Sequence, residues 1–258
     1  MAKRIPVIAA NWKMFKTKDE ALEFIFAVNG AVPSRDEVES IICAPAILLN
    51  LLVKREGEHI RIGAQNMHYA DEGAFTGENS PAQVKTAGAE YILIGHSERR
   101  SLFNETDKDV NLKMHAAFKY DLAPILCIGE QLDTREANKT KEVLDVQLDK
   151  AFEGVSKEQA LKTIVAYEPV WAIGTGKTAT PQMANDTIKD VRAKLSDLYG
   201  AEVAAQVRIL YGGSVKPDNI ESLLQESDID GALIGGAALD HKNFLTFTKA
   251  AKNKGSIK

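Results

Sequence analysis

Short apolar runs rich in β-branched residues alternate along the chain with longer segments in which apolar residues recur at helical spacing. The apolar runs predict strands at residues 4–10, 39–44, 60–64, 91–94, 123–128, 163–167, 207–211 and 231–234. The periodic segments predict helices at residues 18–28, 107–118, 135–152, 181–199 and 217–224. Thr180 before Pro181 and Ser80 before Pro81 add helix start signals, because a hydroxyl N-cap followed by proline favours the first turn.

This alternation of strand and helix is typical of an α/β fold with parallel strands. A strand followed by a helix, repeated about eight times in roughly 250 residues, predicts a single (β/α)8 barrel of eight parallel strands surrounded by helices. The main alternative is a doubly wound open sheet, but the strands begin at even intervals and no segment looks like a linker. We therefore predict one domain over residues 1–258, with the polar and basic residues 249–258 as a solvated end.

Composition places the chain among ordinary globular proteins. Hydrophobic residues make up 45% and charged residues 26%, which argues against disorder, and a net charge of −4 lacks the basic footprint of a nucleic-acid-binding protein. No run approaches the roughly 18 apolar residues of a membrane span, and the N-terminal apolar run is too short for a signal peptide. We therefore expect a cytoplasmic protein. Cys43 and Cys127 each close an apolar run and are expected to be free, buried thiols, although a bridge between them is possible.

Polar side chains gather where the predicted strands end, which is where barrels carry their chemistry. They are Asn11 and Lys13 after the first strand, His96 and Glu98 after the fourth, and Glu168 after the sixth. Any one of them could simply terminate a strand. An amide, an ammonium, an imidazole and two carboxylates at one rim are better explained by a functional site.

Glycine-rich pairs follow the last two predicted strands and favour a phosphate site. Gly213-Ser214 and Gly235-Gly236 lie where barrels often bind anions. Glycine lets backbone N–H groups approach phosphate oxygens, and the N-terminus of a following helix adds a positive dipole. Tight turn geometry alone would also explain the glycines.

Residues 169–177 are interpreted as a mobile loop that covers a ligand. The segment resembles the end of a P-loop, but Trp171 occupies the position of the required first glycine. A dinucleotide fingerprint would follow its strand directly, whereas Gly174 lies six positions beyond Glu168. Glycine and proline hinges around bulky apolar side chains suit a lid that excludes water. The expected lid comprises Pro169, Val170, Trp171, Ala172, Ile173, Gly174, Thr175, Gly176 and Lys177.

Two of the rim residues also have structural explanations. His96 taken alone could be a satisfied core histidine, and the other histidines show no metal-ligand spacing with it, so we predict no metal site. Glu98 could equally form a salt bridge with Lys13, Arg99 or Arg100.

Residues 65–80 form a long connection between the third strand and its helix, where two to six residues are usual. The segment is polar and contains glycine, so it can hardly fold back into its own core. Because it places Phe75 near its tip, we expect a homodimer in which Phe75, Thr76, Gly77 and Glu78 insert into the other subunit. The alternative is a mobile surface loop.

Several motifs resemble those of the triosephosphate isomerase family. They are ANWKM at 10–14, GAFTGE at 73–78, GHSERR at 95–100, AYEPVWAIGTG at 166–176, YGGSV at 211–215 and IGGA at 234–237. They occur in the family's order and spacing, and the YEPVWAIGTG run is close to unique to that family. Ala10, Phe15 and Ala46 depart from common family residues, but none is a reacting group.

The resemblance implies interconversion of dihydroxyacetone phosphate and D-glyceraldehyde 3-phosphate through an enediol(ate), in glycolysis and gluconeogenesis. The family is itself the standard example of a carboxylate base, a neutral histidine and a closing loop. It implies that Glu168 moves a proton between neighbouring carbons and that neutral His96 polarises the carbonyl. Lys13 would supply positive charge, Asn11 a hydrogen bond, and Glu98 would organise Lys13.

The resemblance also implies that backbone around Gly174, Ser214, Gly235 and Gly236 binds phosphate, and that Thr76 reaches the neighbouring subunit's Asn11 and Lys13. No cofactor is implied, because the reaction only moves protons within one substrate. Two alternatives remain: another phosphate-binding barrel enzyme such as an aldolase, which would need a Schiff-base lysine on a strand, and a non-catalytic sugar-phosphate-binding protein.

Overall fold

A computed structural model describes residues 4–173 and 179–256 of the chain and contains one closed barrel of parallel strands. The strands follow one another around the barrel in sequence order, and β8 closes on β1 with Val7 opposite Gly231. They are β1 (Val7–Asn11), β2 (Glu39–Ala44), β3 (Ile60–Ala64), β4 (Tyr91–Ile94), β5 (Ala123–Ile128), β6 (Ile164–Tyr167), β7 (Arg208–Tyr211) and β8 (Gly231–Ile234). The predicted (β/α)8 barrel is confirmed, and the open sheet is not formed.

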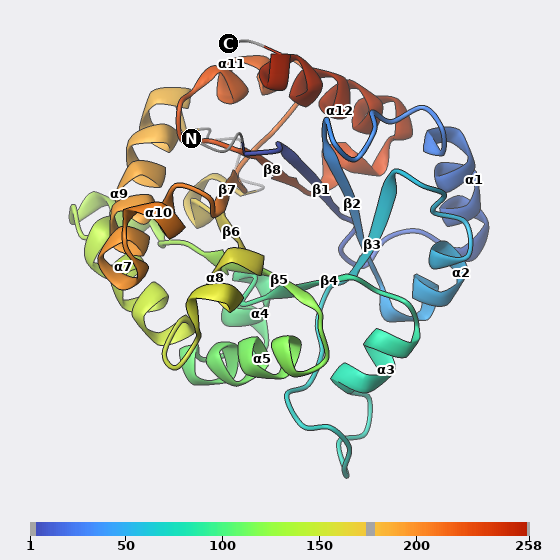
Figure 1. The fold of residues 1–258 in the computed structure, drawn as a ribbon, viewed down its shortest axis with the longest axis horizontal. Helices are drawn as coiled ribbons and strands as arrows, with labels where there is room; N and C mark the ends of the chain where they lie inside the picture. Colours follow the sequence, from blue (N-terminus) through green and yellow to red (C-terminus); the bar gives the residue numbers. More distant parts are fainter. Residues whose placement is uncertain (1–3, 174–178, 257–258) are drawn as a thin grey trace.

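Helices surround the barrel on its outer side (Figure 1). They are α1 (Lys18–Val28), α2 (Leu49–Val53), α3 (Pro81–Thr86), α4 (Ser97–Leu102), α5 (Asp107–Lys119), α6 (Leu132–Glu136), α7 (Thr140–Ala151), α8 (Lys157–Lys162), α9 (Pro181–Tyr199), α10 (Ala201–Ala204), α11 (Ile220–Gln225) and α12 (His241–Ser256). Short 3₁₀ turns follow three strands: η1 (Ala46–Leu48), η2 (Val170–Ala172) and η3 (Gly236–Leu239). In the described part of the chain, every helix is too short or too polar to cross a membrane.

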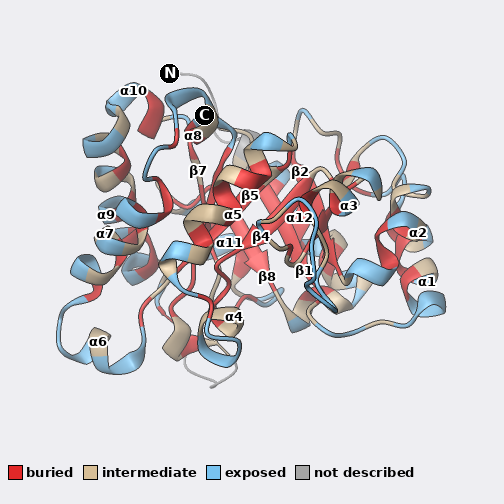
Figure 2. Ribbon diagram, turned by 90° about the horizontal axis from the view of Figure 1, so that it is seen from below, coloured by how far each residue is buried: buried red, intermediate tan, exposed pale blue. Residues whose placement is uncertain are grey.

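Alternate side chains of the strands enter two different apolar cores, because successive residues of a strand point to opposite faces. One set fills the barrel interior, and the other packs under the helices, so the central strands are buried while the outer helix faces remain exposed (Figure 2). The interior set is Val7, Ala9, Ile41, Cys43, Tyr91, Leu93, Ile125, Cys127, Ile164, Ala166, Leu210 and Leu233. Cys43 and Cys127 are free and buried within it, as predicted.

The two predicted helix starts are confirmed. The Thr180 side chain accepts a hydrogen bond from the Met183 N–H at the start of α9. Ser80 and Gln83 form a reciprocal capping box at the start of α3.

Three sequence predictions require correction. The single helix at 135–152 is wrong, because the chain breaks into α6 and α7 around Asn138, whose φ is +57°. The helix predicted at 217–224 begins only at Ile220. The end at 249–258 is not simply solvated: α12 continues to Ser256, Ala251 is buried, and the Lys254 ammonium donates to the carbonyls at the end of α11.

Candidate active site

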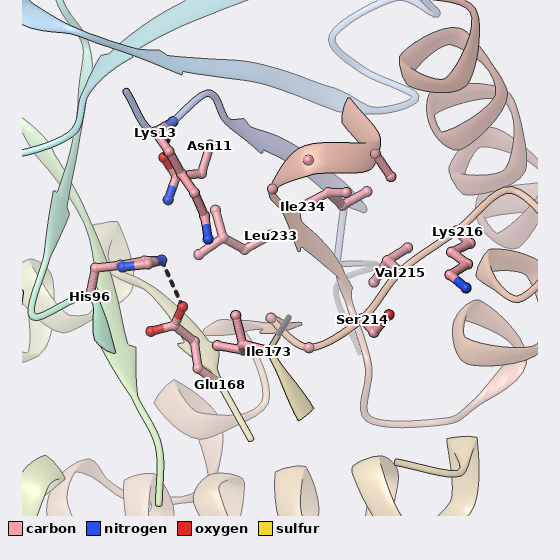
Figure 3. Close-up of a pocket in the computed structure, with 15 residues that line it drawn as sticks. Asn11, Lys13, His96, Glu168, Ile173, Ser214, Val215, Lys216, Leu233 and Ile234 are labelled. Atoms are coloured by element: carbon pink, nitrogen blue, oxygen red, sulfur yellow. Dashed lines mark hydrogen bonds and ion pairs between the residues drawn. The ribbon is translucent and has the colours of Figure 1, made fainter. Parts of the chain in front are cut away.

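A pocket of about 270 Å³ opens at the carboxyl ends of the barrel strands (Figure 3). Side chains enter it from several strand ends that are far apart in the sequence, because the closed sheet brings all eight ends to one rim. The predicted residues found in its lining are Asn11, Lys13, His96, Glu168, Ile173, Ser214, Gly235 and Gly236. Glu98 does not line the pocket but touches it through Lys13.

The Glu168 carboxylate lies directly after β6 and is only 2% exposed. Its Oε2 accepts a hydrogen bond of 3.0 Å from the Ser97 backbone N–H, and its Oε1 lies 2.9 Å from His96 Nε2. Gly212 on the neighbouring strand end leaves space for it, because an added Cβ would lie 2.9 Å from Glu168 Cγ. The carboxylate is therefore buried, oriented and directed into the pocket (Figure 3).

His96 lies two residues beyond the end of β4 and caps the N-terminus of α4. Its Nδ1 accepts the Glu98 backbone N–H at 3.2 Å, which requires a free lone pair on Nδ1 and places the ring proton on Nε2, facing Glu168. Burial lowers the pKa of His96, but the adjacent Glu168 carboxylate and, to a smaller extent, Glu98 together outweigh it, so this pKa is raised while His96 and Glu168 are in contact. A ligand that separated them would remove that effect and favour the neutral imidazole.

Lys13 approaches the pocket from the end of β1 through an unusual backbone. Its φ is +51°, and its N–H donates to Asn11 Oδ1 at 3.0 Å, so the amide of Asn11 supports a strained turn. The Lys13 ammonium lies 2.6 Å from Glu98 Oε1. Glu98 therefore forms the salt bridge that the sequence suggested, and the same salt bridge is how it would organise Lys13. This ion pair directs Lys13 across the pocket rim.

The glycine pair after β8 lies close to this ammonium. A Cβ added at Gly235 would be 3.1 Å from Lys13 Cε, whereas one at Gly236 would meet no described atom within 4 Å. Gly236 also begins η3, and the first N–H groups of a helix have no partner within the helix. Ser214, on the segment after β7, lines the same pocket (Figure 3). The far end of the pocket therefore combines exposed backbone with a nearby positive charge, an arrangement suited to an anion.

Part of the predicted lid is described. Pro169 precedes η2, Trp171 donates its indole N–H to Glu130 Oε1 at 3.0 Å, and Ile173 reaches the pocket lining. Gly174, Thr175, Gly176 and Lys177 lie outside the described residues, and so does the predicted phosphate contact of Gly174.

The predicted dimer loop is not part of the pocket. Phe75, Thr76, Gly77 and Glu78 are all exposed at the tip of the connection between β3 and α3, which projects away from the barrel in Figure 1. The Phe75 ring stacks on His68 of the same loop, with centroids 4.0 Å apart.

Sequence reasoning assigned no role to three residues that support the candidate catalytic side chains or the backbone beside them. Gln65 donates to the carbonyl oxygens of Lys13 and Cys43 at 2.9 and 3.0 Å, and its position directly after β3 was a usable signal. Gly212 is needed for the space it leaves beside Glu168. Ser97 acts through its backbone N–H, and because every residue except proline has this group, the sequence does not reveal the contact.

Within residues 4–173 and 179–256, no group of three or more His, Cys, Asp and Glu side chains could hold a metal ion. The fold and the pocket together define an α/β-barrel protein with a polar site at the carboxyl ends of its strands, the face on which barrel enzymes carry their active sites.

Comparison with known proteins narrows this class. The family profile of triosephosphate isomerase matches residues 6–251. The triosephosphate isomerase of Lactobacillus acidophilus is 49% identical over 243 residues, which cover 94% of this chain and 96% of that protein. The chain belongs to the triosephosphate isomerase family.

Proposed function

We propose that this protein interconverts dihydroxyacetone phosphate and D-glyceraldehyde 3-phosphate. The observation that carries the proposal is the pairing of a buried Glu168 carboxylate with the Nε2–H of His96 in a pocket that Lys13, Gly235 and Gly236 also line. The name and the sequence identity of the relative support the same substrates.

In the proposed reaction, Glu168 removes a proton from the carbon next to the carbonyl and returns it to the neighbouring carbon. The electron pair left by that C–H bond forms a carbon–carbon double bond, and the π pair of the carbonyl moves to its oxygen, which gives an enediolate. His96 donates its Nε2 proton to that oxygen and takes one from the other, so atoms and charge balance over the cycle. Substrate oxygen would take the place of Glu168 at Nε2, which would free the carboxylate to reach carbon.

Lys13 and Asn11 would stabilise the negative charge that develops during this step. The Lys13 ammonium would attract both the enediolate and the phosphate, and the Glu98 ion pair would keep it in place. We propose that the backbone at Ser214, Gly235 and Gly236 binds the phosphate, together with Gly174, which lies outside the described residues. The chemistry moves only protons, so the residues named here suffice for it.

The biological setting is also a proposal. An enzyme acting on triose phosphates would serve glycolysis and gluconeogenesis in the cytoplasm. We further propose a homodimer built around Phe75, Thr76, Gly77 and Glu78, and a lid over the pocket that includes Val170, Ala172 and Ile173.

A coupled assay with D-glyceraldehyde 3-phosphate tests the reaction. We expect turnover by the wild type, incorporation of deuterium at carbon from D₂O, and loss of both in Glu168→Gln. Glu39→Gln is the matched control, because Glu39 is also a buried carboxylate but lies at the opposite end of the barrel, at the start of β2. Cleavage instead of isomerisation would indicate an aldolase, and phosphate-dependent binding without turnover would indicate a non-catalytic protein.

A further inference from the structure

A lysine outside the pocket is buried in an unusual position. Lys113 lies on α5 and is 6% exposed, although lysine rarely loses contact with water unless it is paired. Its ammonium donates to Glu105 Oε2 at 2.8 Å and to Asn66 Oδ1 at 2.7 Å. Burial lowers the pKa of Lys113, and Glu105 opposes that effect. Lys113 therefore joins two segments that are distant in sequence, the α4–α5 connection and the loop after β3.

Glu105 carries the contact from Lys113 to the end of β4. Its Oε1 accepts the Gly95 backbone N–H at 3.0 Å, and its Oε2 also accepts from Arg99 Nε at 2.6 Å. The carboxylate is 7% exposed, so these charge-assisted hydrogen bonds form away from water, where they constrain geometry strongly.

The backbone of Gly95 is constrained on both sides. Its N–H is bound by Glu105, its carbonyl accepts from Arg100 Nε at 2.7 Å, and its φ of +74° is in the left-handed region that favours glycine. Gly95 directly precedes His96, so the orientation of this peptide sets where the imidazole begins.

We infer that Lys113 is a positioning residue that couples the loop after β3 to the imidazole of His96, through Glu105 and the Gly95 peptide. This inference rests on the proposed catalytic role of His96. The other end of the link, Asn66, belongs to the same loop as Phe75, Thr76 and the rest of the proposed dimer contact. Docking of that loop therefore reaches the imidazole through the part-buried bond of Asn66 and the buried bonds of Glu105, in addition to any direct contact across the interface.

The test is a double-mutant cycle between Asn66→Ala and Lys113→Met, with each variant assayed for kcat and KM. Each single change should lower kcat by about tenfold with little change in KM, because a small displacement of a proton donor slows chemistry more than binding. The kcat of the double variant should be no lower than that of the less active single variant, because both changes break the same Asn66–Lys113 connection. Glu105 keeps Arg99 as a partner in all of them, so the fold should persist.

Asn111→Ala is the matched control, because Asn111 also lies on α5 and donates to two backbone carbonyls but has no link to Gly95. It should leave kcat unchanged. Asn66→Asp offers Lys113 an oxygen at the same place and should restore most of the turnover.

Nuclear magnetic resonance of the His96 ring tests the position of the imidazole directly. If Lys113 only stabilised the fold, the His96 ring signals would not change. Its Nε2–H and Cε1–H signals should shift in Asn66→Ala and Lys113→Met and stay in place in Asn111→Ala. Unchanged kcat and unshifted ring signals in both link variants, with an active wild type, would overturn the inference. An inactive wild type would instead refute the proposed function.

Discussion

The reach of the Glu168 side chain gives the sharpest prediction about catalysis. Aspartate at position 168 keeps the charge but shortens the side chain by one methylene, which withdraws the base by roughly 1 Å from the carbon it must reach. We expect Glu168→Asp to lower turnover by about a hundredfold or more while substrate binding changes little. Steady-state kinetics would separate kcat from KM, and an unchanged kcat would mean that another residue is the base.

A second carboxyl has an unusual environment far from the pocket. Glu56 is half-buried, its Oε2 has no hydrogen-bond partner among the described residues, and burial raises its pKa from 4.5 to about 7. Arg61 and Arg35 lower this pKa and Glu90 raises it, but burial has the largest effect. The folded protein therefore binds this proton more tightly than the unfolded chain does. Its contribution to stability is complete below pH 4.5 and is lost as the pH rises through 7.

Replacing Glu56 with glutamine should remove the loss of stability at high pH, because glutamine does not ionise. We expect Glu56→Gln to match the wild type near pH 4.5 and to be more stable at pH 8, by on the order of 1 kcal/mol because water screens a half-buried group. Urea denaturation at both pH values measures the difference. Glu58→Gln, at an exposed position two residues away, is the control and should show no such pH dependence. A Glu56→Gln variant that is less stable than the wild type at pH 8 would contradict the assignment.

The strands were predicted closely because each is a short, mostly apolar and mostly buried run. Helix ends were predicted where a cap marks them, as at Thr180 and Ser80. The break between α6 and α7 was missed because residues 133–142 are almost entirely polar, so no apolar pattern marks a boundary there, and only Asn138 signals the left-handed turn. Helical periodicity reports which face is buried, and it carries little information about one exposed residue with a positive φ.

This break gives a prediction about local stability. Asn138 is exposed with φ of +57°, so a β-branched side chain there would be strained. Asn138→Val should reduce the free energy of unfolding by about 1–2 kcal/mol, whereas Asn138→Gly should be nearly neutral. Lys139→Val is the control, because the next residue is also exposed but has φ of −104°. Equal losses for both valine variants in urea denaturation would show that the left-handed turn is not the cause.

Strand ends were a sufficient guide to most of the pocket lining, because a closed parallel barrel brings every strand end to one rim. Asn11, Lys13, His96 and Glu168 all lie there as the sequence predicted. What could not be predicted is how they contact one another. His96 Nδ1 accepts a backbone N–H from the first turn of α4. The Ser97 N–H, which follows β4, donates to the Glu168 side chain, which follows β6. Such contacts depend on where the closed barrel places each strand end, which the sequence pattern does not specify.

Large apolar side chains are exposed on one side of the barrel. Met14 after β1 is 95% exposed and Ile47 after β2 is 91% exposed, while Phe75 after β3 and Phe103 after β4 are also exposed. The four strands are consecutive neighbours in the barrel, so the connections that carry these side chains leave it on the same side. Isolated exposed apolar residues are common, but a set that follows four adjacent strands indicates an interaction surface.

This surface and the projecting loop lead to the prediction that the protein is a homodimer. A two-fold axis would let each loop at 65–80 cover the apolar residues of the other copy, so that Phe75 is buried twice in one symmetric contact. Light scattering should give twice the chain mass of 28.2 kDa for the wild type.

Shortening the loop around Thr76 should give a weakly active monomer, because the link from Asn66 to His96 would lose its docked loop. Phe75→Ser should weaken the dimer, whereas Phe26→Ser, at another exposed phenylalanine on α1, should not. A wild type that is fully active as a monomer would refute both the dimer and its proposed role in catalysis.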